Sequence, residues 1–277
     1  MNPNSGKTNS AVKEVQDIIK NKGLRLFIVL AGFFIANTLS AEFMGVKIFS
    51  FERTIGQEPV SWSLLGGIWN FDLSAGVLLW PVVFIMTDIM NEYYGQRGVK
   101  FLSWLGAGLI AYAFFMFYGS IQLVPADWWP SSQQARGVVD INASFNGIFG
   151  QGLGIIIGSL SAFILSQILD VTIFHYIKKR TGESMLWLRS TGSTLFSQLI
   201  DTFVVTSIAF YFYPMLVKGN GNPWPLKQLL MVCTGGYLYK FVVALLMTPI
   251  IYLVHNVIER YLGDELATEM KKRAVEV

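Results

Sequence analysis

The chain contains apolar runs of more than 18 residues, and these runs restrict its fold more than any other feature. A helix needs about 20 residues to cross roughly 30 Å of hydrocarbon, because each residue advances it by about 1.5 Å. Only 14% of the residues are charged, whereas a soluble domain carries roughly a quarter. The sequence therefore predicts an all-α integral membrane protein. We expect six transmembrane helices, at about 24–41, 73–91, 101–124, 148–177, 190–217 and 229–258.

Lysine and arginine are distributed unevenly between the two sides that these helices define. The two end segments and the inner loops hold 15 of these residues, and the outer segments hold 5. Positive residues collect on the cytoplasmic side, so we expect both termini in the cytoplasm and a multi-pass protein of the cell inner (plasma) membrane. We divide the chain into a cytoplasmic polar tail (1–23), a six-helix transmembrane domain (24–260) and a cytoplasmic charged tail (261–277).

Few residues in the sequence are suited to hold a metal or a nucleotide. Cys233 is the single cysteine, and the two histidines, His175 and His255, lie far apart in the sequence. These are too few ligands for a protein metal site, so we expect no metal and no cofactor. The chain has no complete phosphate-binding loop and therefore no ATPase machinery of its own. The net charge of +3 is too small to indicate nucleic-acid binding.

A short phrase occurs twice in the sequence, at 166–170 (SQILD) and again at 197–201 (SQLID). Each copy lies in a long apolar run, where a carboxylate is costly unless it has a partner or water. In each copy the glutamine precedes the aspartate by three positions, so the amide and the carboxylate share one face of a helix. The pairs Gln167–Asp170 and Gln198–Asp201 therefore indicate a polar site inside the membrane.

Three further charged residues, Asp88, Glu92 and Lys240, fall inside the predicted helices. Asp88 and Glu92 are four positions apart and therefore lie on one helix face. Asp201 and Lys240 each lie about 11 residues from one end of their helix, which places them roughly 16 Å deep and near the midplane. An acid and a base at this depth are most simply a salt bridge, so we expect Lys240 to pair with Asp201 or with Asp170.

Amide and carboxylate groups together complement the edge of a guanine-like base. A carboxylate accepts hydrogen bonds from the ring N–H and the exocyclic amine together, and an amide donates to the carbonyl oxygen. Aromatic side chains such as Phe174, Phe203 and Tyr237 could stack on such a base. Ion sites and proton relays use the same polar residue types. The residues alone therefore predict a polar-solute or proton-coupled transporter.

Small residues recur at every fourth position of the fourth predicted helix, and the series ends at Asp170. This spacing allows another helix to approach closely, as in glycine-x-x-x-glycine packing. We expect a close helix crossing that positions Asp170. The competing use of the same stripe is a homodimer through Gly150, Gly154 and Gly158.

Two segments resemble the signature sequences of a known family. The segment 87–95 reads TDIMNEYYG, and the segment 186–194 reads LWLRSTGST. Together with Asn37 and the tripeptide at 239–241 (YKF), they resemble the queuosine precursor transporter family, also called the vitamin uptake transporter family. The resemblance extends through all six predicted helices. The chain departs from the usual pattern in a longer outer loop, 49–71, and in its polar N-terminal tail.

The resemblance implies a six-helix fold similar to the substrate-binding subunits of energy-coupling-factor vitamin transporters. It also implies import of 7-deazaguanines, such as 7-cyano-7-deazaguanine and 7-aminomethyl-7-deazaguanine, for salvage into the queuosine modification of tRNA. The implied partners are this small-molecule substrate and the lipid bilayer, with no nucleic acid. The candidate substrate-binding residues are Asn37, Asp88, Asn91, Glu92, Gln167, Asp170, Arg189, Ser193, Gln198, Asp201 and Lys240.

We expect a solitary transporter that alternately exposes a midplane site, with Asp201 and Gln198 as the preferred base-recognising groups. The alternative is a substrate-binding subunit that depends on a separate ATPase module. An intramembrane aspartyl protease built on Asp170 and Asp201 is disfavoured, because the glycine-x-glycine-aspartate phrase is missing and Ile200 precedes Asp201. We therefore expect no enzymatic activity.

Overall fold

The computed structural model describes residues 20–59, 62–64, 67–69, 72–182, 184–217 and 221–276. Most of the predicted N-terminal tail, 1–23, lies outside these residues. Five helical segments of the described chain are long and apolar enough to cross a membrane. They are built on α2 (Lys22–Met44), α4 (Trp80–Ile121), α6 (Leu153–Thr181), α7 (Leu186–Ser207) and α9 (Leu226–Leu262).

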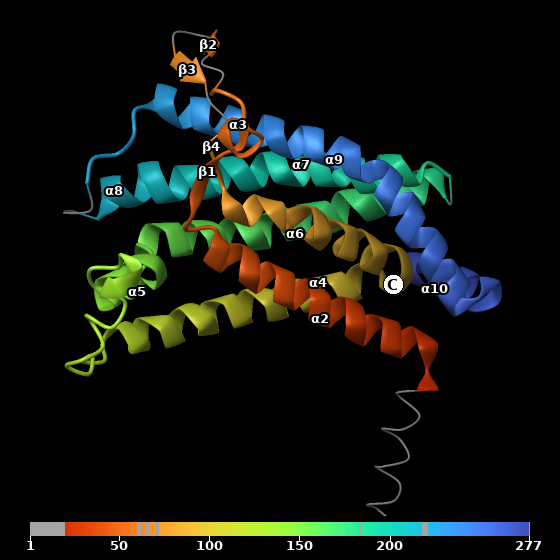
Figure 1. Cartoon of the computed structure of the whole chain (residues 1–277). Helices are drawn as coiled ribbons and strands as arrows, with labels where there is room; N and C mark the ends of the chain where they lie inside the picture. Colours follow the sequence, from red (N-terminus) through yellow and green to blue (C-terminus); the bar gives the residue numbers. More distant parts are fainter. Residues whose placement is uncertain are drawn as a thin grey trace, which may run out of the picture.

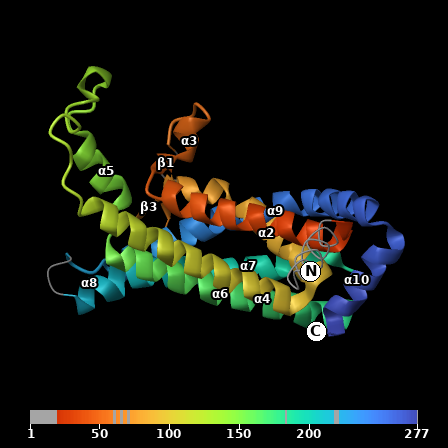
Figure 2. The ribbon, with the colours of Figure 1, turned by 90° about the horizontal axis from the view of Figure 1, so that it is seen from below.

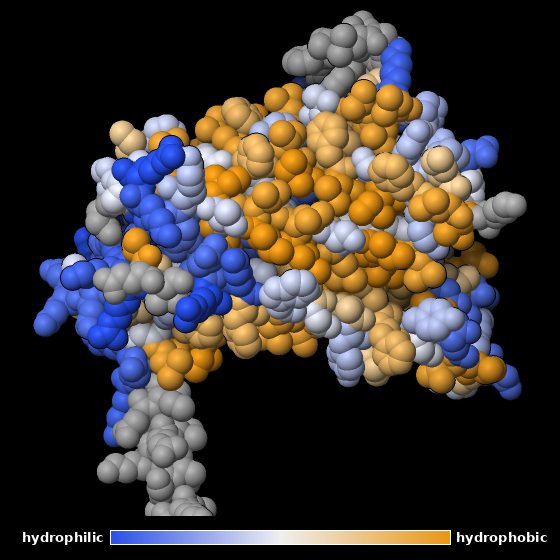
Figure 3. All heavy atoms as spheres, turned by 180° about the vertical axis from the view of Figure 1, so that it is seen from behind, coloured by the Kyte–Doolittle hydropathy of each residue, from blue (hydrophilic) through white to orange (hydrophobic). Residues whose placement is uncertain are grey.

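The long helices lie lengthwise against one another in an elongated bundle (Figures 1 and 2). A short helix, α10 (Asp264–Glu276), lies at one end of the bundle, and α5 (Ile141–Phe149) lies at the other. Figure 3 shows a broad hydrophobic band over the middle of one face, with hydrophilic residues gathered at the α10 end. Large apolar side chains such as Phe115 and Leu246 are 72% and 63% exposed. An apolar surface of this extent is suited to lipid, which confirms the expected integral membrane protein.

Helix α4 folds back on itself at Gly95, where φ is 71° and ψ is −176°. The ring of Phe163 lies 6.3 Å from the ring of Trp80, and a Cβ built on Gly106 would lie 3.5 Å from the same Phe163 ring. In a straight helix Trp80 and Gly106 would be about 39 Å apart. Figure 1 shows the reversal, so α4 contains two antiparallel arms, 80–94 and 96–121.

Only glycine fits at this turn. Its positive φ is a conformation that other residues rarely adopt. A Cβ on Gly95 would also lie 2.8 Å from the carbonyl oxygen of Ala274 in α10. Helix α10 therefore packs directly on the turn, and the predicted charged tail, 261–277, contains an ordered helix that is part of the bundle end.

Short elements fill the connections outside the long helices. The loop predicted at 49–71 and the residues that flank it contain two small antiparallel strand pairs, although the side chains of residues 60–71 lie outside the described structure. Strand β1 (Ile48–Ser50) pairs with β4 (Asp72–Ser74), and β2 (Trp62–Leu64) pairs with β3 (Gly67–Trp69). The remaining short elements are α3 (Phe51–Thr54), η1 (Ala75–Leu78), η2 (Gln134–Arg136), η3 (Ile208–Phe212) and α8 (Tyr213–Leu216).

The small-residue stripe of α6 packs inside the chain, against the segment that runs from α7 into α8. A Cβ on Gly158 would lie 2.9 Å from the carbonyl oxygen of Val205, and one on Gly154 would lie 2.6 Å from the ring of Tyr213. The expected close helix crossing is therefore confirmed. Chain–chain association through the stripe stays a prediction, and two of its glycine faces are already occupied by the chain itself.

Candidate functional site

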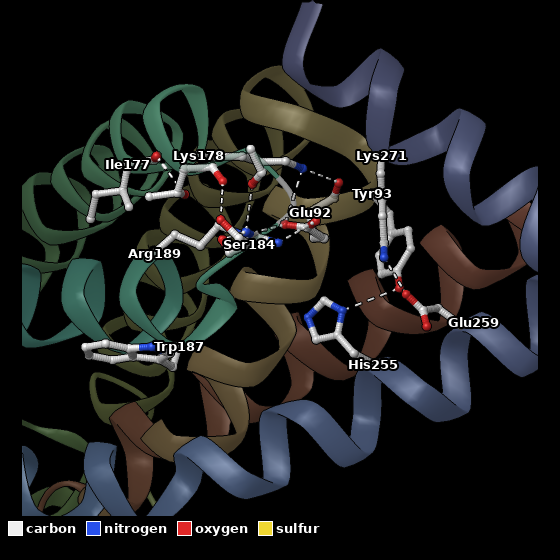
Figure 4. Close-up of polar contacts among 12 residues, drawn as sticks. Glu92, Tyr93, Ile177, Lys178, Ser184, Trp187, Arg189, His255, Glu259 and Lys271 are labelled. Carbon is white, nitrogen blue, oxygen red and sulfur yellow. Dashed lines mark hydrogen bonds and ion pairs between the residues drawn. The ribbon is translucent and has the colours of Figure 1, made fainter.

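Three charged side chains meet at the α10 end of the bundle and form what we call the inner clamp: Glu92 of α4, Lys178 of α6 and Arg189 of α7 (Figure 4). Arg189 donates from Nε and Nη2 to the two carboxylate oxygens of Glu92, each at 3.0 Å. Lys178 Nζ lies 3.2 Å from Glu92 Oε2 and donates to the Glu92 carbonyl oxygen at 3.0 Å. The exposed fractions of the three side chains are 0%, 1% and 2%.

Arg189 also fixes the connection between α6 and α7. Its Nη1 donates to the backbone oxygens of Gly182 and Ser184, at 3.0 and 2.9 Å. A planar guanidinium can satisfy a carboxylate and two carbonyls at once, which an ammonium group cannot do in this geometry. The groups of Glu92 and Arg189 are thus committed to one another and to the backbone. They close the α10 end of the bundle.

A second set of polar residues connects α10 to the same region of the bundle. The hydroxyl of Tyr93 lies 3.4 Å from Nδ1 of His255, and the two rings stack with centroids 5.6 Å apart. Lys271 of α10 pairs with Glu259 of α9 and lies 5.6 Å from the centroid of the Tyr93 ring (Figure 4). These contacts hold α10 on the bundle beside the clamp.

Further from the α10 end, serines on one face of α7 form hydrogen bonds to two buried aspartates. We call Ser190, Ser193 and Ser197 the serine ladder. The Ser190 hydroxyl donates to Asp88 Oδ2 of α4, and the Ser193 and Ser197 hydroxyls lie 2.8 and 3.4 Å from Asp170 Oδ1 of α6. The ladder therefore brings together the carboxylates of two predicted site residues that are 82 positions apart in the sequence.

Several polar atoms beside the ladder have no hydrogen-bond partner among the described residues. They include Oδ1 of Asp88, Oδ2 of Asp170, Oε1 of Gln198 and both side-chain polar atoms of Asn91. All four side chains are at most 4% exposed. Buried polar groups are normally satisfied, so a cluster of unpartnered ones inside a membrane protein indicates a ligand site.

A pocket opens on one side of Asp88, between the first arm of α4, α7 and α9. Its wall is mostly apolar and aromatic, and the rings of Trp80 and Phe84 stack with centroids 5.9 Å apart. The hydroxyls of Thr191, which lines the pocket, and Thr248 lie 2.9 Å apart. The pocket is lined by Val77, Trp80, Pro81, Phe84, Ile85, Asp88, Thr191, Thr194, Tyr239, Lys240, Val243, Ala244, Met247 and Ile251.

Lys240 lies on the far side of this pocket from the inner clamp and pairs with Asp201. Its Nζ lies 2.7 Å from Asp201 Oδ2, with side-chain exposures of 14% and 13%. This confirms the predicted pair. Asp201 does not line the pocket, and the carboxylate that does so is Asp88.

The other predicted residues are less directly connected to the pocket. Asn37 donates to the Phe33 carbonyl oxygen of its own helix at 2.8 Å. Gln167 lies 3.3 Å from the Ser103 hydroxyl, beside a smaller cleft between the second arm of α4 and α6. Of the three aromatic residues expected to stack on a base, Phe174, Phe203 and Tyr237, none lines the pocket; Trp80, Phe84 and Tyr239 do so instead.

One polar contact was missed because the first predicted helix ends at residue 41. Helix α2 continues to Met44, and the Glu42 carboxylate accepts from the Ser159 hydroxyl of α6 at 2.6 and 2.7 Å. The apolar residues of the pocket wall were also missed, because in the sequence they cannot be told from lipid-facing or packed side chains. The stacked Trp80–Phe84 pair, four positions apart, was the one available signal.

The fold and the site together define a class of protein: a multi-pass membrane protein with a mostly apolar pocket among its helices and a buried carboxylate in the pocket wall. The chain belongs to the vitamin uptake transporter family, since the family model described as "Putative vitamin uptake transporter" matches residues 74–254. The family is one of transporters and not of enzymes.

Curated relatives carry a more specific description. A "Probable queuosine precursor transporter" of Bacillus subtilis is 34% identical over 191 residues, which cover 68% of this chain and 75% of the relative. A protein of the same description from Haemophilus influenzae is 26% identical over 72% of this chain and 75% of the relative. The "Queuosine precursor transporter" of Escherichia coli is 25% identical over 76% of this chain and 82% of the relative. No solved structure matches the chain significantly.

Proposed function

We propose that the protein imports 7-deazaguanine precursors of queuosine, such as 7-cyano-7-deazaguanine, across the cell inner membrane. The observation that carries this proposal is the position of Asp88. It lines a pocket walled by aromatic rings, and its Oδ1 has no partner among the described residues. The descriptions of the curated relatives support the same substrate class.

The chemistry of the pocket suits a flat, guanine-like base. The Asp88 carboxylate would accept from the ring N–H and the exocyclic amine of the base, the strong two-point form of recognition. Thr191 and Thr194 supply hydroxyls that donate or accept, and Trp80 and Phe84 supply faces for stacking. We therefore assign base recognition to Asp88 in place of Asp201, whose oxygen is bound to Lys240.

We further propose six membrane crossings, with both ends in the cytoplasm and a fold similar to the substrate-binding subunits of energy-coupling-factor transporters. The reversal at Gly95 supports the count, because it divides the 42 residues of α4 into two arms. The arms 80–94 and 96–121 correspond to the second and third predicted helices. The excess of lysine and arginine on the α10 side supports the orientation.

The two ion pairs suggest how access would alternate. The inner clamp lies on the α10 side of the pocket. Lys240 precedes Thr248 by eight residues, so the Lys240–Asp201 pair lies about 12 Å beyond the Thr191–Thr248 contact along α9. Opening of one pair at a time would expose Asp88 to one side of the membrane and then to the other. A transporter that works in this way needs no second protein.

Uptake of labelled 7-cyano-7-deazaguanine tests the assignment. We expect Asp88→Asn to lower uptake about ten- to a hundredfold, because a hydrogen bond to a charged group contributes roughly 1.5–3 kcal/mol. Asp140→Asn is the matched control: Asp140 caps α5 outside the pocket, and asparagine caps a helix equally well. Normal uptake in Asp88→Asn, together with lost binding in Asp201→Asn, would return base recognition to Asp201.

Reconstitution separates the solitary transporter from a subunit that needs an ATPase. We expect the purified protein in liposomes to accumulate the substrate without a partner. Substrate binding without transport under these conditions would favour the alternative, a substrate-binding subunit that depends on a separate ATPase module.

A further inference from the structure

We propose that Asp88 and Asp170 form the site of a small monovalent cation, Na⁺ or H⁺, that is transported together with the substrate. This inference rests on the proposed transport function, which it extends from the substrate to the source of energy. The carboxylates share the serine ladder, and Asp88 also lines the substrate pocket.

The ladder places the two carboxylates within about one turn of α7. Ser190 donates to Asp88, and Ser193, three positions further along, donates to Asp170, with its hydroxyl oxygen 3.1 Å from the Ser190 carbonyl oxygen. Residues three apart on a helix have Cβ atoms about 5–6 Å from one another. The negative charges of Asp88 and Asp170 are close enough to act on each other.

The charged groups around this pair do not neutralise it. Neither Asp88 nor Asp170 forms an ion pair with a lysine or arginine in the described part of the chain. Arg189 lies in the same region, but its guanidinium is bound to Glu92 and to two backbone carbonyls. Two nearby carboxylates that are 1% and 3% exposed are costly without a counter-charge.

Each aspartate offers the chemistry that a small cation requires. Asp88 Oδ1 and Asp170 Oδ2 have no partner among the described residues. Asn91, one turn along α4 from Asp88, and Gln198, next to Ser197, are buried with unpartnered amide oxygens. Carboxylate, amide and hydroxyl oxygens are the ligands that hard cations prefer, and a carboxylate alone suffices for a proton.

The shared residue provides the coupling. Asp88 belongs both to the pocket and to the carboxylate pair, whereas Asp170 does not line the pocket. A Na⁺ between the two carboxylates, or a proton on Asp170, would leave Asp88 ionised with a compensating charge beside it, which is the form that binds the base. Cation binding would then raise substrate affinity, and by linkage the substrate would raise the affinity for the cation equally.

Proteoliposomes with imposed gradients test the proposal. We expect a Na⁺ gradient or a pH gradient, applied separately, to stimulate uptake at least about fivefold, the lower limit of typical coupling. Asp170→Asn should abolish this stimulation while substrate binding to the purified protein persists. The Na⁺ and pH arms identify the ion, and uptake that responds to neither gradient would overturn the proposal.

Two further variants keep the outcome interpretable. Glu42→Gln is the matched control, because it neutralises another membrane carboxylate but retains the contact with Ser159, and its gradient response should equal that of the wild type. Ser193→Ala removes the closer donor to Asp170 and should raise the half-saturating cation concentration. If Asp170→Asn does not fold, an unchanged cation dependence in Ser193→Ala would count against the site.

Cation binding without substrate separates this inference from the proposed function. We expect Na⁺ or a lower pH to raise the Tm of the purified protein, and we expect this effect to be absent in Asp170→Asn. A cation effect in a protein that fails to bind any 7-deazaguanine would refute the substrate and retain the ion site. Substrate binding with no cation effect would refute the ion site alone.

Discussion

Arg189 grips Glu92 with two parallel hydrogen bonds, Nε to Oε2 and Nη2 to Oε1, both 3.0 Å long and both out of contact with solvent. The two residues come from α7 and α4 and are 97 positions apart in the sequence. The pair gives a physical reason for two conspicuous polar residues in the signature segments 87–95 and 186–194. They assemble the α10 end of the bundle and need not touch a substrate.

Replacement of Arg189 should therefore damage folding before it affects binding. Arg189→Ala leaves the Glu92 carboxylate with Lys178 alone and two backbone carbonyls without their donor, and loss of one partner of a buried pair costs about 3–5 kcal/mol. Arg189→Lys should recover only part of this, because lysine lacks the fork. Thermal unfolding in detergent measures the effect. Arg273→Ala, which removes an exposed pair with Glu269, is the control, and equal Tm values for both alanine variants would contradict the clamp.

Gly95→Ala should destabilise the protein by several kcal/mol. Alanine at a positive φ costs about 1–3 kcal/mol, and its Cβ would lie 2.8 Å from the Ala274 carbonyl oxygen, so α10 must move. Gly108→Ala in the second arm of α4 is the control, since nothing lies within 4 Å of a Cβ there. The measurement is Tm, together with protease sensitivity of α10. A Gly95→Ala protein with wild-type Tm and a protected α10 would be inconsistent with this turn.

The Lys240–Asp201 pair should be replaceable as a unit but not one residue at a time. Lys240→Met leaves the Asp201 carboxylate, which is 13% exposed, without its counter-charge. We expect the free energy of unfolding to fall by about 1–3 kcal/mol, less than for fully buried pairs. Adding Asp201→Leu should restore most of the Tm, because an apolar pair of similar size needs no counter-charge. If the pair gates the pocket, uptake stays low in the double variant although the fold is regained. Recovery of both would reduce the pair to a structural contact.

Gly158→Ala separates the two uses of the small-residue stripe. The added methyl would lie 2.9 Å from the Val205 carbonyl oxygen and force α6 from α7, so Tm should fall. Gly119→Ala, with open space at its Cβ, should leave Tm unchanged. Light scattering of both purified variants reports the oligomeric state. An unchanged Tm with loss of a dimer would show that the stripe joins two chains.

Sequence patterns were sufficient where a physical rule acts locally. Apolar length predicted the long membrane helices, and the four-residue stripe predicted the close approach at Gly158. Matched depth predicted that Lys240 pairs with Asp201 or Asp170, and the structure shows the pair with Asp201. Depth favours Asp201 for base recognition, which stays a prediction, whereas the pocket lining favours Asp88. Asp201 lies deeper, but depth does not determine which carboxylate has a partner, and in the structure it is Asp88 that lines the pocket with an unpartnered oxygen.

The remaining features depend on contacts between distant segments. The wall of the pocket combines residues of α4 and α9 such as Trp80 and Met247, which are 167 positions apart and have no pattern in common. The role of Gly95 depends on Ala274, and that of Glu42 depends on Ser159. These pairings cannot be predicted from a single sequence, because each depends on how whole helices pack against one another.

The packing of α10 on Gly95 also affects the order in which contacts can form during synthesis of the chain. Ala274 is translated about 180 residues after Gly95, and at roughly 5–20 residues per second this interval is about 9–36 seconds. During this interval the residues of α4 have been synthesised, whereas α10, the segment that covers the turn, has not. The nascent protein therefore passes through a stage in which the turn at Gly95 is not yet covered by α10.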